Sequence, residues 1–443
     1  MQGDFNEGEE LYIILPGSMG GGIYQLLRPL YGIKQAAQNF YNSLERILLD
    51  FGFKHSRVDP CLFVYSDPDK PHITMLLLTH VDDILLAYKK SSDLTITPDI
   101  QKMLDEIQVV RKAFIAKFAH RFDFLDNGPV HHYLGMEIIR DRTAGTLGLC
   151  QAAYLQRILK RFDQHLCTRS SSHTPSATVE LAPEDTDTFY GPKETNLLKN
   201  LREVIGALIY ACTATRPDLS YAVSALASYV SNPAKKHYKA AKRILSYIRN
   251  SLNFGIQYTR VTNGSDPYRL QGYSDADYAS DTRTRRSRSG TLILFGGGPI
   301  IWGSSLQSVI ALSSTESEYN AAIHLGQEIA YVHQIFEAMY IPVPKPTPLL
   351  CDNESTIRII KDRFKMRNTR HVQVKFLKME EWIKDKFIEM VKVPSKDNLA
   401  DWFTKGTLTY EQFCHNRSGV MHPLNSSALV EPPAKSSSNV QSK

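Results

Sequence analysis

Residues 8–165 alternate short apolar runs with longer stretches of helical periodicity. Residues 35–50 are the clearest helical stretch, because Phe40, Leu44 and Leu48 recur every four residues and predict one apolar face. The apolar runs have the length of strands, and the later ones follow one another closely enough to predict an antiparallel meander. These predicted strands are residues 9–15, 62–65, 73–78 and 84–88.

The middle of the chain changes character twice. Residues 168–200 are rich in Ser, Thr, Pro, Asp and Glu, which predicts a linker or long loop. Residues 201–251 return to helical periodicity, with breaks before Pro217 and at Asn232–Pro233. The last of these helices carries a basic stripe, which alone is typical of a solvated face, with phosphate contact as the alternative. The stripe consists of Lys235, Lys239, Lys242 and Arg249.

Residues 268–408 predict a separate unit with the order β-β-β-α-β-α-β-α. This order is typical of a mixed sheet with helices on its faces. The last residues are rich in Ser, Pro and Lys, which predicts a disordered tail. The chain therefore divides into segments 1–165, 166–200, 201–262, 268–408 and 409–443.

Composition narrows the classes of protein that remain. The length of 443 residues suits about two or three domains, and the net charge of +6 permits a polyanionic partner without requiring one. The six cysteines are scattered without a C-x-x-C pair, which argues against a zinc site or a disulfide framework and fits a reducing compartment. No apolar run approaches the roughly 18 residues of a membrane span, and the acidic start lacks the features of a secretory signal.

Four acidic residues stand at distinctive places in the predicted C-terminal unit. Asp275 lies in its first strand, Glu318 in the first turn of its long helix, Asp352 at a strand end, and Asp401 in its last helix. Each has an ordinary explanation, such as a helix cap or a solvated surface. Asp275 is the exception, because a carboxylate inside a strand needs a partner.

The order of these acids, with the sequence around them, resembles the ribonuclease H domain of copia-type LTR retrotransposons. The resemblance covers about residues 271–405. It implies two divalent metals, Mg²⁺ or Mn²⁺, held by hard carboxylate oxygens for in-line cleavage of a phosphodiester. The matching stretches are 272–279 (GYSDADYA), 285–290 (RRSRSG), 311–319 (ALSSTESEY), 351–353 (CDN) and 398–405 (NLADWFTK).

The resemblance also implies a role for each acid. Asp275 would bridge both metals, Glu318 and Asp352 would complete the metal on the leaving side, and Asp401 would hold the metal that activates water. Glu318 is preferred over Glu316, because the family's glutamate directly precedes the aromatic or apolar residue that enters the helix. Glu316 is then expected to cap the helix.

Basic residues near this site are expected to contact nucleic acid. An arginine run in a loop is often only solvent-facing, but beside a groove for a hybrid it favours phosphate contact. These arginines are Arg283, Arg285, Arg286 and Arg288. His371 matches a family histidine, whereas Met366 and Leu377 stand where the family usually has others, a change that concerns substrate positioning and not metal binding.

The N-terminal half is similar to the copia-type reverse transcriptase. Residues 30–41 (LYGIKQAAQNFY), with Lys34 and Gln35, resemble the motif that supports template and incoming nucleotide. The further matching stretches are 59–65 (DPCLFVY), 80–83 (HVDD), 133–138 (YLGMEI) and the helical block 205–218. The resemblance implies an α+β and α/β multidomain protein: a partial palm and thumb, then a ribonuclease H-like mixed five-stranded sheet with flanking helices.

Asp82 and Asp83 occupy the position of the polymerase signature, with His80 in place of the usual tyrosine. A bare Asp-Asp between strands is more often a plain turn, but the resemblance favours a metal site. The family supplies a further aspartate from an earlier palm strand, which the stretch from Met1 does not match, and Asp4 matches a later, non-catalytic position. Two-metal nucleotidyl transfer needs both strands, so we expect a polymerase-deficient chain unless a partner completes the site.

The function expected from the sequence is metal-dependent cleavage of RNA in RNA–DNA hybrids by a fragment of a retrotransposon Pol polyprotein. The expected partners are the hybrid and template nucleic acid, with other retrotransposon products such as Gag and integrase, and no membrane. One alternative is a catalytically dead relic or a co-opted nucleic-acid-binding protein. Another is an intact RNA-directed DNA polymerase, if the gene continues upstream.

Overall fold

The structure is a computed structural model that describes residues 10–27, 36–67, 69–70, 73–88, 98–166, 172–176, 181, 192–260, 266, 268–361 and 370–424. The chain separates into two units, residues 1–128 with 332–342 and residues 129–331 with 343–443. Among the described residues, no helix combines the length and apolar content needed to cross a membrane.

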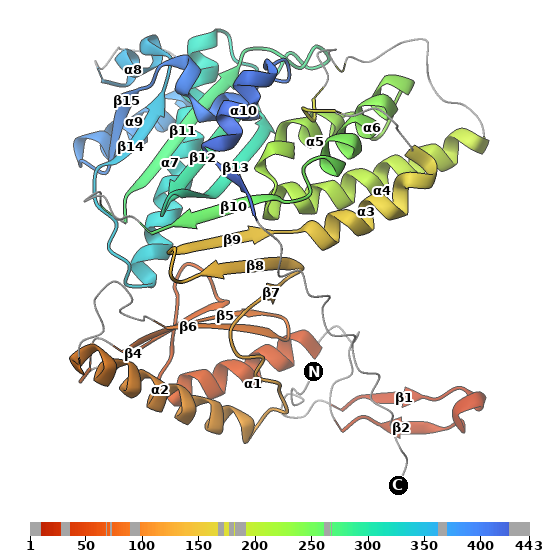
Figure 1. Ribbon diagram of the computed structural model, residues 1–443, viewed down its shortest axis with the longest axis vertical. Helices are drawn as coiled ribbons and strands as arrows, with labels where there is room; N and C mark the ends of the chain where they lie inside the picture. Colours follow the sequence, from red (N-terminus) through yellow and green to blue (C-terminus); the bar gives the residue numbers. More distant parts are fainter. Residues whose placement is uncertain are drawn as a thin grey trace. The chain divides into compact units, whose positions relative to one another are not determined.

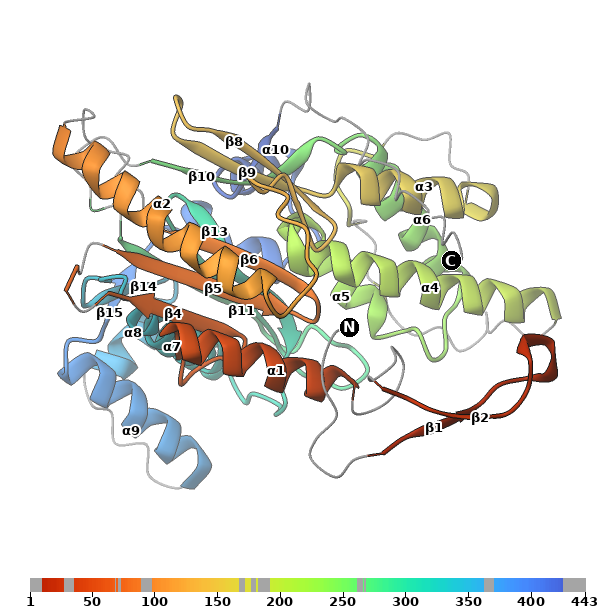
Figure 2. The same ribbon diagram turned by 90° about the horizontal axis from the view of Figure 1, so that it is seen from below.

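The first unit is built on an antiparallel sheet with the order β3-β4-β5-β6. These strands are Lys54–His55, Leu62–Ser66, Thr74–His80 and Asp83–Tyr88. Helices α1 (Ala36–Phe51) and α2 (Pro98–Ala119) lie together on one face of this sheet (Figures 1 and 2). A separate hairpin pairs β1 (Tyr12–Ile14) with β2 (Ile23–Gln25).

An aromatic core joins this sheet to its two helices. Leu44 and Leu48 of α1 are fully buried, as the periodicity predicted. Strand β5 alternates buried and half-buried residues because successive side chains point to opposite faces. Rings from both helices, from strand β4 and from the residues that follow each helix pack here, namely Phe40, Phe53, Phe63, Phe114, Phe118 and Phe122.

The second unit contains two five-stranded sheets. One has the order β16-β10-β9-β8-β7, and its strands are Met421–Pro423, Phe254–Thr259, Thr146–Cys150, Met136–Asp141 and His132–Tyr133. Helices pack together beside it and gather into one bundle in both views of the ribbon. These helices are α3 (Ala152–Leu166), α4 (Pro192–Ala214), α5 (Ser220–Ala227) and α6 (Lys235–Arg249), with the short turn η2 (Pro217–Leu219).

The other sheet has the order β13-β12-β11-β14-β15 and is mixed, as the sequence predicted. Its strands are Gly298–Leu306, Arg288–Phe295, Leu270–Asp277, Thr347–Cys351 and Ile388–Lys392. Strands β11, β12 and β13 are antiparallel, whereas β14 and β15 run parallel to β11. Parallel strands need crossovers, and helices supply them here. The helices are α7 (Ser314–Ala338), α8 (Glu354–Lys361) and α9 (Arg370–Lys384).

The end of the chain differs from the expected disordered tail. Residues Tyr410–Ser418 form α10, and β16 pairs with β10. Phe413, Val420 and Met421 are buried in a core that also holds residues of the helical bundle and of the mixed sheet. The apolar side chains thus order this segment, a contribution that the Ser-, Pro- and Lys-rich composition concealed. Residues 425–443 lie outside the described residues.

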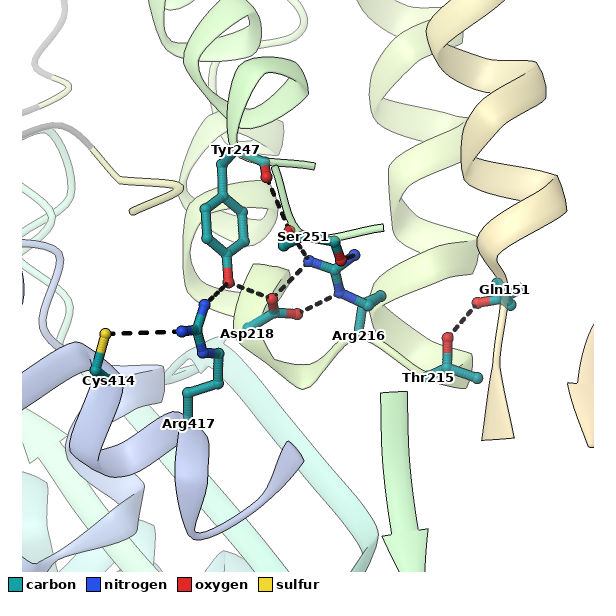
Figure 3. A network of polar contacts seen from close by, with 8 residues as sticks. All are labelled: Gln151, Thr215, Arg216, Asp218, Tyr247, Ser251, Cys414 and Arg417. Atoms are coloured by element: carbon teal, nitrogen blue, oxygen red, sulfur yellow. Dashed lines mark hydrogen bonds and ion pairs between the residues drawn. The ribbon is translucent and has the colours of Figure 1, made fainter. Parts of the chain in front are cut away.

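A buried ion pair with its hydrogen bonds joins two segments of the bundle, around η2 and the end of α6, to α10 (Figure 3). Arg216, fully buried, donates two hydrogen bonds to the carboxylate of Asp218, at 2.9 and 2.7 Å. It also donates to the hydroxyl and the carbonyl of Ser251. The Tyr247 hydroxyl donates to Asp218 at 2.7 Å and accepts from Arg417 of α10 at 3.2 Å. Every charged group in this network therefore has a partner, which a buried charge requires.

We predict that Asp218→Ala lowers the free energy of unfolding by about 3–5 kcal/mol, because it leaves the Arg216 guanidinium buried without its counter-ion. Urea unfolding of the purified chain measures the change. Glu203→Ala is the matched control, since its 2.6 Å pair with Arg161 lies at the surface and contributes roughly 0–1 kcal/mol. Equal losses for the two variants would contradict the prediction.

Candidate active site: a buried cluster of carboxylates

Asp275 is the central acid of the cluster, and it lies inside β11 with only 2% of its surface exposed. A carboxylate this deep in a sheet needs polar partners. The Thr404 hydroxyl donates to its Oδ2 atom, and the Lys405 ammonium lies 3.8 Å from the same oxygen. Thr404 and Lys405, the polar partners of Asp275, therefore come from the end of the domain, more than 120 residues away in sequence.

The two candidate glutamates in the first turn of α7, Glu316 and Glu318, have different environments. Ser313 accepts a hydrogen bond from the Glu316 backbone N–H, and the Glu316 carboxylate accepts one from the Leu312 N–H at 2.7 Å, so Glu316 closes the start of the helix. Glu318 turns inward and is 7% exposed. Its Oε2 atom is buried, and no described residue hydrogen-bonds to it. This oxygen is therefore available to a ligand.

Parallel pairing of β14 with β11 places Asp352 next to Asp275. Tyr273 pairs with Leu350, so two residues further along both strands Asp275 and Asp352 stand at the same level of the sheet. Cys351 ends β14 and is fully buried, and Asp352 follows it at the half-buried edge. The strand end expected for Asp352 is thus also the position that brings the two carboxylates together.

Asp401 reaches the cluster from a 3-10 helix, η4 (Leu399–Phe403), and not from the α-helix that the sequence suggested. Asn398 holds this turn in place: its side-chain oxygen accepts from the Ala400 N–H, and its amide donates to the Ser274 carbonyl at 3.0 Å. Ser274 directly precedes Asp275 in β11. The side chain of Asn398 therefore fixes η4 against the strand that carries the central acid.

Gly290 allows η4 to approach the sheet. It pairs with Asp275 across β11 and β12. A Cβ atom at this position would lie 2.7 Å from the Ala400 carbonyl oxygen and 2.9 Å from the Cβ of Phe403. Only a residue without a side chain permits this close approach of backbone to strand. This close approach explains why a glycine ends the stretch 285–290.

The four acids form two overlapping groups with the spacing of metal ligands. Atoms of Asp275, Asp352 and Asp401 that could bind a metal lie within 4.8 Å of one another. The second group, within the same distance, consists of Glu318, Cys351 and Asp352. The structure thus assembles all four sequence-predicted acids, with Asp352 common to both groups.

Burial and mutual repulsion disfavour the charged forms of Asp275, Glu318 and Asp401. Burial, followed by the charges of Asp275 and Asp352, raises the pKa of Glu318 to about 9. Burial and the charge of Asp275 likewise raise the pKa of Asp401 to about 6, although Lys405 opposes this. Burial also raises the pKa of Asp275. A bound cation would relieve this cost.

Among the described residues, Lys405 places a positive charge beside the carboxylates. Its Nζ atom lies 2.7 Å from Asp401 Oδ1. Burial would lower the pKa of Lys405, but the charges of Asp275 and Asp401 more than offset that and raise it. Asn398, Thr404 and Lys405 lie in the stretch 398–405 that resembles the family, but the sequence alone assigns them no role. The four-residue spacing of Asp401 and Lys405 was the available signal.

The family described as "Reverse transcriptase (RNA-dependent DNA polymerase)" matches residues 3–177. The retrovirus-related Pol polyprotein from transposon TNT 1-94 of Nicotiana tabacum is 31% identical over 388 residues, which is 86% of this chain. The chain belongs with the Pol polyproteins of copia-type retrotransposons. It spans 27% of the length of the tobacco polyprotein.

Two solved structures are similar to parts of this Pol chain. Ribonuclease H1 from the archaeon Halobacterium salinarum covers 30% of the chain and is itself covered to 90%, with 16% identity and a TM-score of 0.23. The foamy viral protease-reverse transcriptase in complex with dsDNA covers 84% of the chain and is covered to 61%, with 14% identity and a TM-score of 0.43.

The structure places Asp82 and Asp83 at the tip of the β5–β6 hairpin in the first unit. His80 pairs with Asp83, so Val81 and Asp82 form the two-residue turn. Val81 has a φ of 57°, which is rare for a β-branched residue. Both aspartates are exposed. Among the described residues, neither belongs to a group of three potential metal ligands.

The expected nucleic-acid contacts differ in exposure. Arg283, Arg285 and Arg286 are exposed in the loop that joins β11 to β12, close in sequence to Asp275. Arg288 is buried, donates to the Ser224 hydroxyl at 2.8 Å and lies over the ring of Tyr221. It fixes the bundle to the sheet. Lys34, Gln35 and the side chain of His371 lie outside the described residues.

We predict that Gly290→Ala displaces η4 and lowers the free energy of unfolding by about 1–3 kcal/mol, because the added methyl group overlaps backbone atoms that cannot move freely. Urea unfolding measures the loss, and calorimetric titration with Mn²⁺ should show weaker binding through the displaced Asp401. Gly303→Ala in β13 is the control, since its Cβ would meet only the Thr291 hydroxyl at 3.4 Å. A Gly290→Ala variant as stable as Gly303→Ala would contradict this account of the close approach.

Proposed function

We propose that the unit around the mixed sheet cleaves RNA in RNA–DNA hybrids with the aid of divalent cations, Mg²⁺ or Mn²⁺. The observation that supports this proposal is the convergence of Asp275, Glu318, Asp352 and Asp401 from four separate elements. A helix cap or a solvated acid would explain any one of them alone. Neither explains why Asp275, Glu318 and Asp401 are buried beside one another, because burial disfavours the charged form of each.

The ligand set fits a hard divalent cation. Carboxylate oxygens are the ligands that Mg²⁺ and Mn²⁺ prefer. The unpartnered Oε2 atom of Glu318 gives an independent reason to expect a ligand there, because a buried polar atom left without a partner is costly. The thiol of Cys351 stays protonated at neutral pH, since burial raises its pKa to about 12, so it does not compete as an anionic ligand.

When bound, a pair of such cations activates a water molecule and stabilises the leaving oxygen of an in-line displacement. The residues of the chain hold and orient the reacting groups. By the family's assignment, Asp275 would be a ligand of both cations. Glu318 and Asp352 would complete the ligands on the leaving side, and Asp401 would complete those on the water side. The exposed arginines Arg283, Arg285 and Arg286 are placed to contact phosphates of the hybrid.

The decisive experiment compares the two glutamates of the α7 start. We predict that Glu318→Gln and Asp275→Asn each lower the rate of hybrid cleavage by about 100-fold or more, because each removes a charged metal ligand. Glu316→Gln should leave the rate within about threefold, since its carboxylate only caps the helix. The assay follows a labelled RNA strand in a hybrid with Mg²⁺ or Mn²⁺.

Circular dichroism would first establish that the three variants are folded. Cleavage that survives Asp275→Asn would exclude the proposed site. A wild-type chain that binds the hybrid with micromolar affinity but never cleaves it would instead support a nucleic-acid-binding protein without catalysis.

We infer separately that this chain alone does not extend a primer. The hairpin aspartates Asp82 and Asp83 are exposed, and no third carboxylate among the described residues joins them in a metal-binding group. Two-metal nucleotidyl transfer needs such a set of ligands.

We predict no extension of a DNA primer on an RNA template by the purified chain, with Mg²⁺ or Mn²⁺ and all four nucleotides. Extension that is abolished in an Asp82→Asn, Asp83→Asn variant would overturn this inference, because it would show that these aspartates do work in a complete site. A commercial reverse transcriptase on the same template controls for the quality of primer and nucleotides.

A further inference from the structure

A lysine ammonium lies within the carboxylate cluster itself. The Nζ atom of Lys405 is 2.7 Å from Asp401 Oδ1 and 3.8 Å from Asp275 Oδ2. The backbone of Lys405 is also held next to Asp401, since the Lys405 N–H donates to the Asp401 carbonyl at 3.0 Å. Its neighbour Thr404 donates to Asp275. The two residues together thus bridge the two acids.

This ammonium and a divalent cation would compete for the same oxygens. Asp275 and Asp401 belong to one group of potential metal ligands, and Lys405 contacts a carboxylate oxygen of each. Two cations a few ångströms apart in a partly buried site repel strongly. The lysine must therefore leave when a metal enters, and its side chain, 39% exposed, has a path toward solvent.

We propose that Lys405 is an internal counter-ion that holds Asp275 and Asp401 together before metal binds and that the metal then displaces. Lys405 thereby sets the metal concentration at which the site fills. This inference rests on the proposed function, because it takes the acid cluster to be a metal site. A lysine suits the role, because it is a compact charge on a flexible stem that can move without distorting the backbone.

Alternative roles for Lys405 predict different outcomes. A purely structural lysine would, when replaced, loosen the cluster and weaken metal binding. A displaced counter-ion would do the opposite, because its removal abolishes the competition while leaving all the carboxylate ligands in place. The direction of the change in metal affinity therefore separates the two roles, independently of any catalytic assay.

The experiment titrates the full chain with Mn²⁺ alone, without nucleic acid, by calorimetry. Lys405→Met removes the charge and keeps the length of the side chain. We expect it to bind Mn²⁺ about tenfold more tightly than the wild type and to unfold at a lower temperature in EDTA. Lys405→Arg keeps the charge and should bind within about threefold of the wild type. Lys396→Met, at an exposed lysine of the preceding turn η3 (Ser395–Asp397), controls for the loss of one positive charge.

Unchanged or weaker Mn²⁺ binding by folded Lys405→Met would overturn the inference. If that variant does not fold, Lys405→Gln, which keeps a hydrogen-bond donor near Asp401, provides the same comparison. Failure of the proposed function looks different: wild type and Asp275→Asn would then bind Mn²⁺ equally or not at all. If the wild type binds Mn²⁺ and Lys405→Met does not bind it more tightly, only the role of Lys405 is overturned.

Discussion

The burial of several carboxylates beside one another is the constraint that the surroundings of the mixed sheet must meet. Asp275, Glu318 and Asp401 are almost fully buried, and Asp352 stands beside them. Left to electrostatics alone, such groups would separate or become protonated. The fold keeps them together through the rigidity of the strands and helices that carry them, and the Lys405 ammonium compensates part of the charge.

Several contacts around the cluster serve this purpose by restricting η4. Asn398 ties the turn to β11, Ser304 donates a 2.6 Å hydrogen bond to the Phe403 carbonyl, and Gly290 leaves room for the backbone. The helical bundle supports the same region from outside the sheet. Ser224 donates to the Ser304 carbonyl, and Trp302 donates to the Cys212 carbonyl at 2.6 Å. The mixed sheet and the bundle therefore share a core and a polar interface.

The two acidic sites of the chain contrast in a way that bears on their chemistry. At the β5–β6 turn, Asp82 and Asp83 are exposed, so water solvates their carboxylates without a protein partner or a cation. In the mixed sheet, burial imposes a cost that only a specific ligand or counter-ion repays. Burial therefore favours a bound cation in the mixed sheet. For Asp82 and Asp83, only the resemblance to the polymerase signature favours one.

The sequence by itself indicated the four candidate acids, most of the order of strands and helices around them and the relation to retrotransposon Pol polyproteins, because local periodicity and motif spacing are written directly in the chain. The structure adds a second helix, α9, between β14 and β15, and has the 3-10 helix η4 where an α-helix was expected. The resemblance to the ribonuclease H family also favoured Glu318 over Glu316, a choice that helix-capping patterns alone left open. The roles of Gly290, Asn398 and Lys405, the burial of Arg288 and the ordering of α10 were decided only by the tertiary structure. Each depends on a contact between segments far apart in sequence, and no local pattern specifies which distant backbone or charge a side chain will meet.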